Sequence, residues 1–96
     1  MKFKEWLNED KFGLDSMGDK QMIREAINEE NNAINLYEIM ANKTRNGKVR
    51  EVMLHVAREE KVHIGEFEEL LEMIDPQYKP ASEEGEEELE DRGIKD

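Results

Sequence analysis

Residues 53–74 read MLHVAREEKVHIGEFEELLEMI, and the spacing of their apolar side chains decides the fold. Positions on one face step by 3, 4, 3, 4, 3 and 4 residues: Met53, Val56, Glu60, His63, Phe67, Leu70 and Ile74. This is the spacing of a helix that packs in a bundle. We call this face the seam. The two polar exceptions, Glu60 and His63, are adjacent on it, so the stretch predicts a long amphipathic helix with a polar interruption in its packing face.

The preceding segment has the same pattern. Its seam positions step by 3, 4, 3, 4 and 3: Ile23, Ala26, Glu30, Ala33, Tyr37 and Met40. We expect one helix over residues 20–43, capped by Asp19, and a second over 48–74, ended by Asp75 and Pro76. The intervening Thr-Arg-Asn-Gly at 44–47 is turn chemistry, so the two helices form an antiparallel hairpin.

A two-helix hairpin cannot enclose a core by itself. Each helix buries one stripe against the other and leaves a second apolar flank open. Two copies related by a two-fold axis close this flank most simply. The sequence therefore predicts an all-α fold, in which a two-helix antiparallel hairpin dimerises into a four-helix bundle.

Composition excludes several classes of protein. Among 96 residues, 14 Lys and Arg stand against 25 Asp and Glu, a net charge of −11. This balance argues against partners such as nucleic acid or an anionic membrane surface, which need a basic patch. The absence of Cys excludes thiolate metal sites on this chain. No apolar run approaches the ~18 residues of a membrane span, and no secretory signal is present, so a cytoplasmic setting is expected.

The flanks differ from the hairpin. Residues 1–18 form an N-terminal arm of mixed character, the hairpin occupies 19–78, and residues 79–96 form an acidic tail. From residue 81 onward the tail has eight acidic residues, two basic residues and only three apolar side chains. Because so little apolar surface can be buried there, we predict a disordered tail.

The polar interruptions of the seam suggest a metal site. Glu30 and Glu60 each lie fifteen residues from Arg45, so folding the hairpin places them at the same depth. His63 lies one helical turn from Glu60. Buried carboxylates need compensating positive charge, and neither seam contains Lys or Arg.

The ligand count indicates half of a di-iron site. Such a bundle uses one Glu from each of two helices and Glu-x-x-His from each of the other two. One chain offers Glu30 and Glu60-x-x-His63, so two copies supply four carboxylates and two imidazoles for two metals. A plain coiled coil, with Glu as a register device, is the alternative. His55 lies off the seam and is read as an exposed, ion-paired residue, whereas the Tyr37 hydroxyl is expected to point toward the carboxylates.

These residues also resemble a known family, the encapsulated ferritins. The resemblance rests on Glu30, on Tyr37 seven residues later, and on the stretches AINLYE at 33–38 and VAREEKVH at 56–63. It covers residues 20–78 and implies that the four-helix bundle is ferritin-like. It implies a ferroxidase that oxidises Fe(II) to Fe(III) at a di-iron site between two subunits, with two irons per dimer interface. It further implies a ring of dimers such as a decamer, and a role in iron storage and detoxification inside a cytoplasmic encapsulin shell.

The resemblance also assigns residues. Glu30, Glu60 and His63 match the metal ligands and catalytic residues, Tyr37 matches a tyrosine behind them, and Glu29 matches part of an outer metal-uptake site. The chain departs from some members at Asn32, where a second acidic residue stands, and at Leu36, where Trp stands. Two rival functions remain open: a rubrerythrin-like di-iron oxidoreductase, and a non-catalytic helical adaptor or cargo protein.

Overall fold

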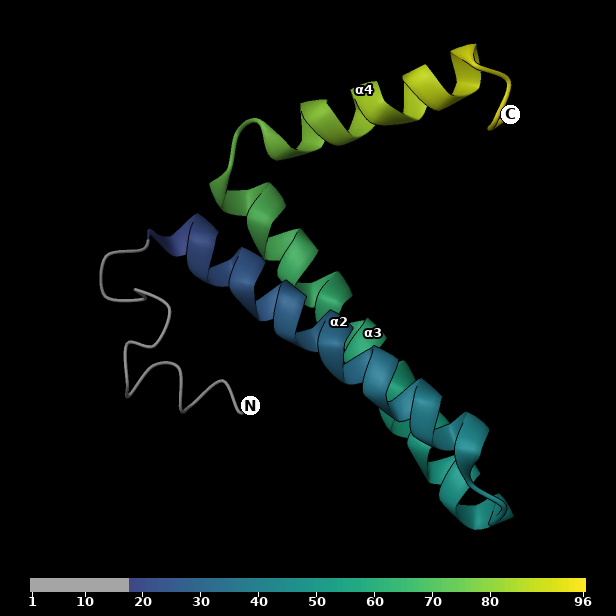
Figure 1. Ribbon diagram of the computed structural model, residues 1–96. Coiled ribbons are helices and arrows are strands. Elements are labelled where there is room, and N and C mark those ends of the chain that lie inside the picture. The colour runs from purple at the N-terminus through teal and green to yellow at the C-terminus, as the bar shows by residue number, and fades with distance from the viewer. Residues whose placement is uncertain (1–17) are drawn as a thin grey trace.

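The computed structural model describes residues 18–96. All regular secondary structure in this part of the chain is helical (Figure 1). Helix α2 spans Asp19–Lys43, α3 spans Gly47–Ile74 and α4 spans Tyr78–Asp91. The predicted all-α class is therefore confirmed. The predicted arm lies outside the described residues, apart from Gly18. Of the described helices, none is long and apolar enough to cross a membrane.

Helices α2 and α3 form the predicted hairpin, but α2 begins one residue earlier than expected. Its N-cap is Gly18, not Asp19, and Asp19 occupies the first turn. The Gly18 N–H donates to the Gln21 side chain at 2.7 Å. A carboxylate in the first turn stabilises a helix through the helix dipole, so the acidic signal at Asp19 was real but one position off.

The turn between α2 and α3 is held by side chains that satisfy helix ends. The Asn46 side chain accepts hydrogen bonds from the N–H groups of Lys48 and Val49, at 2.9 and 3.2 Å, and so caps α3. The Arg50 side chain donates to the carbonyl of Ala41, near the end of α2, at 3.1 Å. These contacts fix the level at which the two helices face each other.

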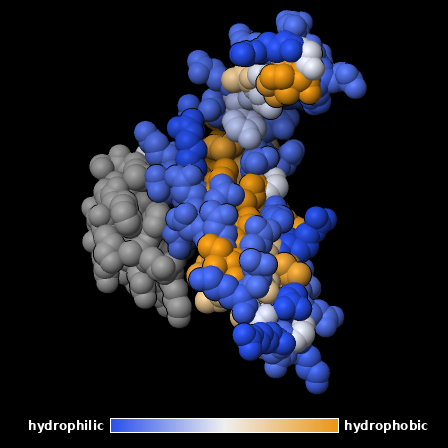
Figure 2. Space-filling view, turned by 45° about the vertical axis from the view of Figure 1, so that its right-hand side comes forward, coloured by the Kyte–Doolittle hydropathy of each residue, from blue (hydrophilic) through white to orange (hydrophobic). Residues whose placement is uncertain are grey.

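The hairpin core is narrow. It consists of Ala26, Ile34, Ala41, Ala57 and Leu71. The small alanine side chains allow the two helices to approach closely. On α3 the buried Ala57 and Leu71 each stand one position after a seam residue, so on this helix the seam lies beside the core. On α2, Ala26 belongs to both the seam and the core. Leu70 and Ile74 of the seam are exposed. Figure 2 shows apolar side chains in a stripe along the hairpin, bordered by hydrophilic residues.

The end of α3 is tied to the start of α2 by Asp75. This carboxylate is buried and forms ion pairs with Arg24 at 3.4 Å and Lys20 at 4.0 Å. It also accepts a hydrogen bond from the N–H of Gln77 at 3.0 Å, just before α4 begins. One side chain thus closes the open end of the hairpin and sets the exit of the chain toward α4.

The prediction of a disordered tail is wrong for residues 79–91, which belong to α4. This helix leads away from the hairpin (Figure 1), and its residues after Tyr78 are exposed. Glutamate is a strong helix former, so α4 forms without a core. Pro80 is tolerated because it lies in the first turn, where its missing N–H has no partner within the helix. The division into arm, hairpin and tail remains a prediction.

The C-terminal end of α4 is a Schellman motif. Gly93 has φ of +72°, in the left-handed region that favours glycine. The N–H of Ile94 donates to the carbonyl of Leu89 at 2.9 Å, and that of Gly93 donates to Glu90 at 2.9 Å. This pair of bonds is the hydrogen-bond pattern of the motif. The residues 93–95 therefore act as a helix stop.

Candidate metal centre

The hairpin brings Glu30 of α2 together with Glu60 and His63 of α3. His63 Nδ1 lies 3.5 Å from Glu30 Oε1 and 3.8 Å from Glu60 Oε2. One potential ligand atom from each residue lies within 4.8 Å of the other two. The convergence predicted from equal distances to the turn is confirmed, and the role of the three residues as ligands stays a prediction.

The two carboxylates are more buried than the imidazole. The side chains of Glu30 and Glu60 are 19% and 20% exposed, and that of His63 is 45% exposed. Glu30 Oε2 is fully covered, and among the described residues it is the one buried side-chain oxygen or nitrogen without a hydrogen-bond partner. An orphaned carboxylate oxygen is costly to bury, so this atom is suited to a cation that brings its own charge.

Nearby basic side chains are engaged elsewhere. Lys61 follows Glu60 in the sequence, yet its ammonium group contacts Glu38 at 2.9 Å. The ion pairs of Glu30 and Glu60 both run to His63. Two carboxylates therefore share one imidazole, and a carboxylate and imidazole donor set suits Fe(II), Mn(II) or Zn(II).

A hollow of about 270 Å³ lies against this cluster. It is lined by Glu30, His63, Glu66 and Phe67. Glu66 is an exposed residue that the sequence reasoning missed. The signal was available, because Glu60, His63 and Glu66 repeat at three-residue intervals on one helix, and residues three apart are neighbours on a helix surface.

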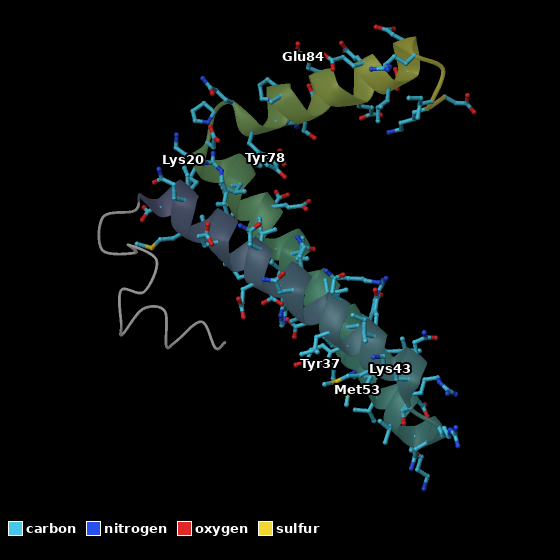
Figure 3. The ribbon with its side chains drawn as sticks, in the orientation of Figure 1. Lys20, Tyr37, Lys43, Met53, Tyr78 and Glu84 are labelled. Carbon is cyan, nitrogen blue, oxygen red and sulfur yellow. The ribbon has the colours of Figure 1, made fainter. Side chains whose placement is uncertain are left out.

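The remaining predicted residues lie outside the three-residue cluster. Tyr37 is half-buried and projects from the same edge of the hairpin as Met53 of the seam (Figure 3). Its expected contact with the carboxylates is absent from the hydrogen bonds of the described residues. Glu29 is half-buried as well. His55 is exposed and pairs with Glu59 at 3.8 Å, as expected for a residue off the seam.

Comparisons with known proteins found a family, a relative and a solved structure that are similar to this chain. The family model described as Rubrerythrin matches residues 21–93. A ferritin-like–encapsulin shell fusion protein from Pyrococcus furiosus is 51% identical over 57 residues, which are 59% of this chain and 16% of that protein. The crystal structure of an encapsulated ferritin domain from Pyrococcus furiosus is similar, with a TM-score of 0.76 and 44% identity over 80% of each chain.

The family match includes α4 as well as the hairpin, since it continues to residue 93. The chain spans about one sixth of the length of the fusion protein. That protein is described as ferritin-like, and the similar crystal structure is of an encapsulated ferritin domain. The chain belongs to the rubrerythrin family, whose model matches most of its length.

Proposed function

We propose that this chain is a ferroxidase, which oxidises Fe(II) to Fe(III) at a site completed by a second copy of itself. The observation that carries the proposal is the cluster of Glu30, Glu60 and His63 on an open apolar face. One chain supplies two carboxylates and one imidazole, which is half of the donor set of a di-iron bundle. Two such faces brought together by a two-fold axis supply the complete set.

The burial pattern supports the same dimer. Seam residues on both sides of the cluster keep exposed apolar surface, including Met40 on α2 and Leu70 and Ile74 on α3. Burial of apolar surface is worth about 25 cal/mol per Å², so covering this face with a second copy contributes favourably to assembly. The exposed apolar surface and the incomplete set of metal ligands therefore lie on the same face of the hairpin.

Fe(II) is the substrate of the proposed reaction. Glu30 and Glu60 would hold it through oxygen, and His63 through nitrogen. Two Fe(II) ions held side by side release two electrons to an oxidant and become two Fe(III) ions. The net charge of −11 raises the concentration of cations near the protein and so assists the supply of Fe(II).

The proposal includes an encapsulin shell as partner. The Pyrococcus furiosus relative is named as a fusion to a shell protein, and the similar crystal structure is of an encapsulated ferritin domain. A thin helical hairpin has no cavity in which a mineral could accumulate. We therefore infer that storage of Fe(III) takes place within a compartment formed by another protein, with this chain as its oxidising component.

The experiment is a ferroxidase assay on the wild type and paired variants. Glu60→Gln and His63→Ala should each lower the initial rate of Fe(III) formation at least tenfold while far-UV circular dichroism stays helical. Glu59→Gln and His55→Ala are the matched controls, because they make the same chemical changes in an exposed pair on the same helix. The controls should keep the wild-type rate. Wild-type rates in both seam variants would contradict the proposed site.

The family model gives a second candidate function, reduction of peroxide by a rubrerythrin-like di-iron site. Both reactions use the same cluster, so the oxidant distinguishes them. Comparison of O₂ and H₂O₂ under single-turnover conditions decides the question. Fast oxidation by O₂ followed by release of Fe(III) supports the ferroxidase. Iron that stays bound and turns over repeatedly with H₂O₂ and a reductant supports the second candidate.

A further inference from the structure

The hollow beside the candidate metal centre has one wall whose charge the proposed function does not use. Of its four lining residues, Glu30 and His63 belong to the cluster, Phe67 is an apolar seam residue, and Glu66 is exposed. Glu66 lies three residues after His63, so it stands one turn further along the same side of α3. The hollow is thus lined by one mostly buried carboxylate, Glu30, and by one exposed carboxylate, Glu66.

The two carboxylates that line this hollow differ in exposure. Glu30 Oε2 is covered and has no hydrogen-bond partner within the described chain. The apolar ring of Phe67 forms part of the wall and supplies no ligand atom. Glu66 is the more exposed of the two carboxylates, so a divalent cation from solvent reaches it more readily than it reaches Glu30.

We propose that Glu66 is the uptake residue of this site, which captures Fe(II) from solvent at the rim of the hollow and passes it to Glu30 and His63. This inference rests on the proposed function. Glu66 is a positioning residue for the incoming cation and takes no part in electron transfer. Its position also differs from that of Glu29, which lies on α2 outside the lining of the hollow.

The role makes a kinetic prediction. Charged clefts raise association rates about 10- to 1000-fold in total, and one carboxylate of the set contributes at the low end of that range. Glu66→Gln should therefore slow the second-order binding of Fe(II) by about three- to tenfold. The stoichiometry of bound iron and the oxidation rate at saturating Fe(II) should stay within about twofold, because the ligands themselves are unchanged.

The test is anaerobic stopped-flow binding of Fe(II), with Co(II) absorption as a second readout that does not depend on turnover. Glu66→Asp keeps the charge and should restore most of the rate. Glu69→Gln is the matched control, since it removes the same charge from the next exposed turn of α3, outside the lining of the hollow. Glu29→Gln tests the alternative, in which Fe(II) enters through the outer uptake site that the family resemblance assigns to Glu29. The difference between Glu66→Gln and wild type should shrink as salt is raised.

Several results would overturn the inference. Equal binding rates in Glu66→Gln, Glu69→Gln and wild type would show that Glu66 has no special role. A large slowing in Glu29→Gln alone would place uptake on α2. Loss of bound iron from Glu66→Gln at equilibrium would make Glu66 a ligand and not an uptake residue. A wild-type chain that binds no Fe(II) would overturn the proposed function together with this inference, whereas normal wild-type binding with an unaffected Glu66→Gln would overturn the inference alone.

Discussion

The hairpin and α4 are both helical, but different interactions hold them. Helices α2 and α3 bury a narrow core of alanine, isoleucine and leucine against each other. Helix α4 has no buried residue, and its stability comes from helix propensity, the Schellman motif at Gly93 and its connection at Asp75 and Tyr78. A helix without a core is therefore an ordered element here, and lack of apolar residues is a poor guide to disorder when glutamate dominates.

The hairpin and α4 also differ in how far their carboxylates are buried. The hairpin keeps two mostly buried carboxylates on its packing face, where they oppose stability until a cation arrives. The more numerous carboxylates of α4 are all exposed and cost nothing to hydrate. Position, and not the amount of acidic charge, distinguishes a candidate site from a solvated helix.

The largest expected effect comes from removing core packing in the hairpin. Leu71 is 3% exposed, and Leu71→Ala should lower the free energy of unfolding by about 2 to 5 kcal/mol. Leu89 of α4 is 43% exposed, so Leu89→Ala should cost less than about 1 kcal/mol. Urea unfolding at one fixed protein concentration measures both. Equal losses would remove the distinction between the two regions.

The second prediction concerns the junction between them. Asp75→Ala removes the ion pairs to Arg24 and Lys20 and the hydrogen bond from Gln77. Because both basic partners can be hydrated, the loss should be about 1 to 2 kcal/mol. The distance distribution between spin labels on α3 and α4 should also broaden. Glu59→Gln, which removes an exposed carboxylate paired with His55 at 3.8 Å within α3, is the control. An unchanged distribution in Asp75→Ala would mean that other contacts orient α4.

Two glycines of α4 should respond in opposite directions. Gly85 has open space around its Cα, so Gly85→Ala should stabilise α4 by about 0.5 to 1 kcal/mol through helix propensity. Gly93 has positive φ, so Gly93→Ala should weaken the end of α4 by about 1 kcal/mol. Amide hydrogen exchange resolved by residue reads both effects. The exchange protection of amides in the hairpin should not change. A change in that protection would show that the hairpin and α4 unfold together.

The smallest effect is a pH dependence at the junction. Burial, followed by the charges of Glu68 and Glu72, raises the pKa of Tyr78 above its usual value of 10.0. The folded chain therefore holds the phenolic proton more tightly than the unfolded chain. This contribution is fully present below pH 10 and is lost as pH rises through the folded pKa. Absorbance titration of wild type and Tyr78→Phe measures the shift, and a titration of Tyr78 at or below its usual value would contradict it.

Much of the hairpin was predictable from the sequence, because the period of the apolar residues and the turn at 44–47 are local signals. Equal spacing from Arg45 correctly brought Glu30 and Glu60 together. The N-cap at Gly18 was missed by one residue, since both Gly18 and Asp19 are acceptable caps and the Gln21 contact is visible only in three dimensions.

The remaining errors have physical causes. Helix α4 was predicted to be disordered because it has little apolar area to bury, whereas glutamate has high helix propensity and Gly93 provides a helix stop. Glu66 was missed because it lies off the seam, although its place three residues after His63 is visible in the sequence. The hollow that it shares with Glu30 forms only when α2 packs against α3. The buried connection of Asp75 to Arg24 spans 51 residues, so no local pattern could reveal it.

We propose above that the face carrying Glu30, Glu60 and His63 is completed by a second copy that shares iron with it. Native mass spectrometry of the full chain under anaerobic conditions, with and without Fe(II), can decide this. We expect assemblies with an even number of chains that take up two irons per dimer, and His63→Ala assemblies that lose this iron. Monomers that bind no iron, or dimers with equal iron content in wild type and His63→Ala, would contradict it.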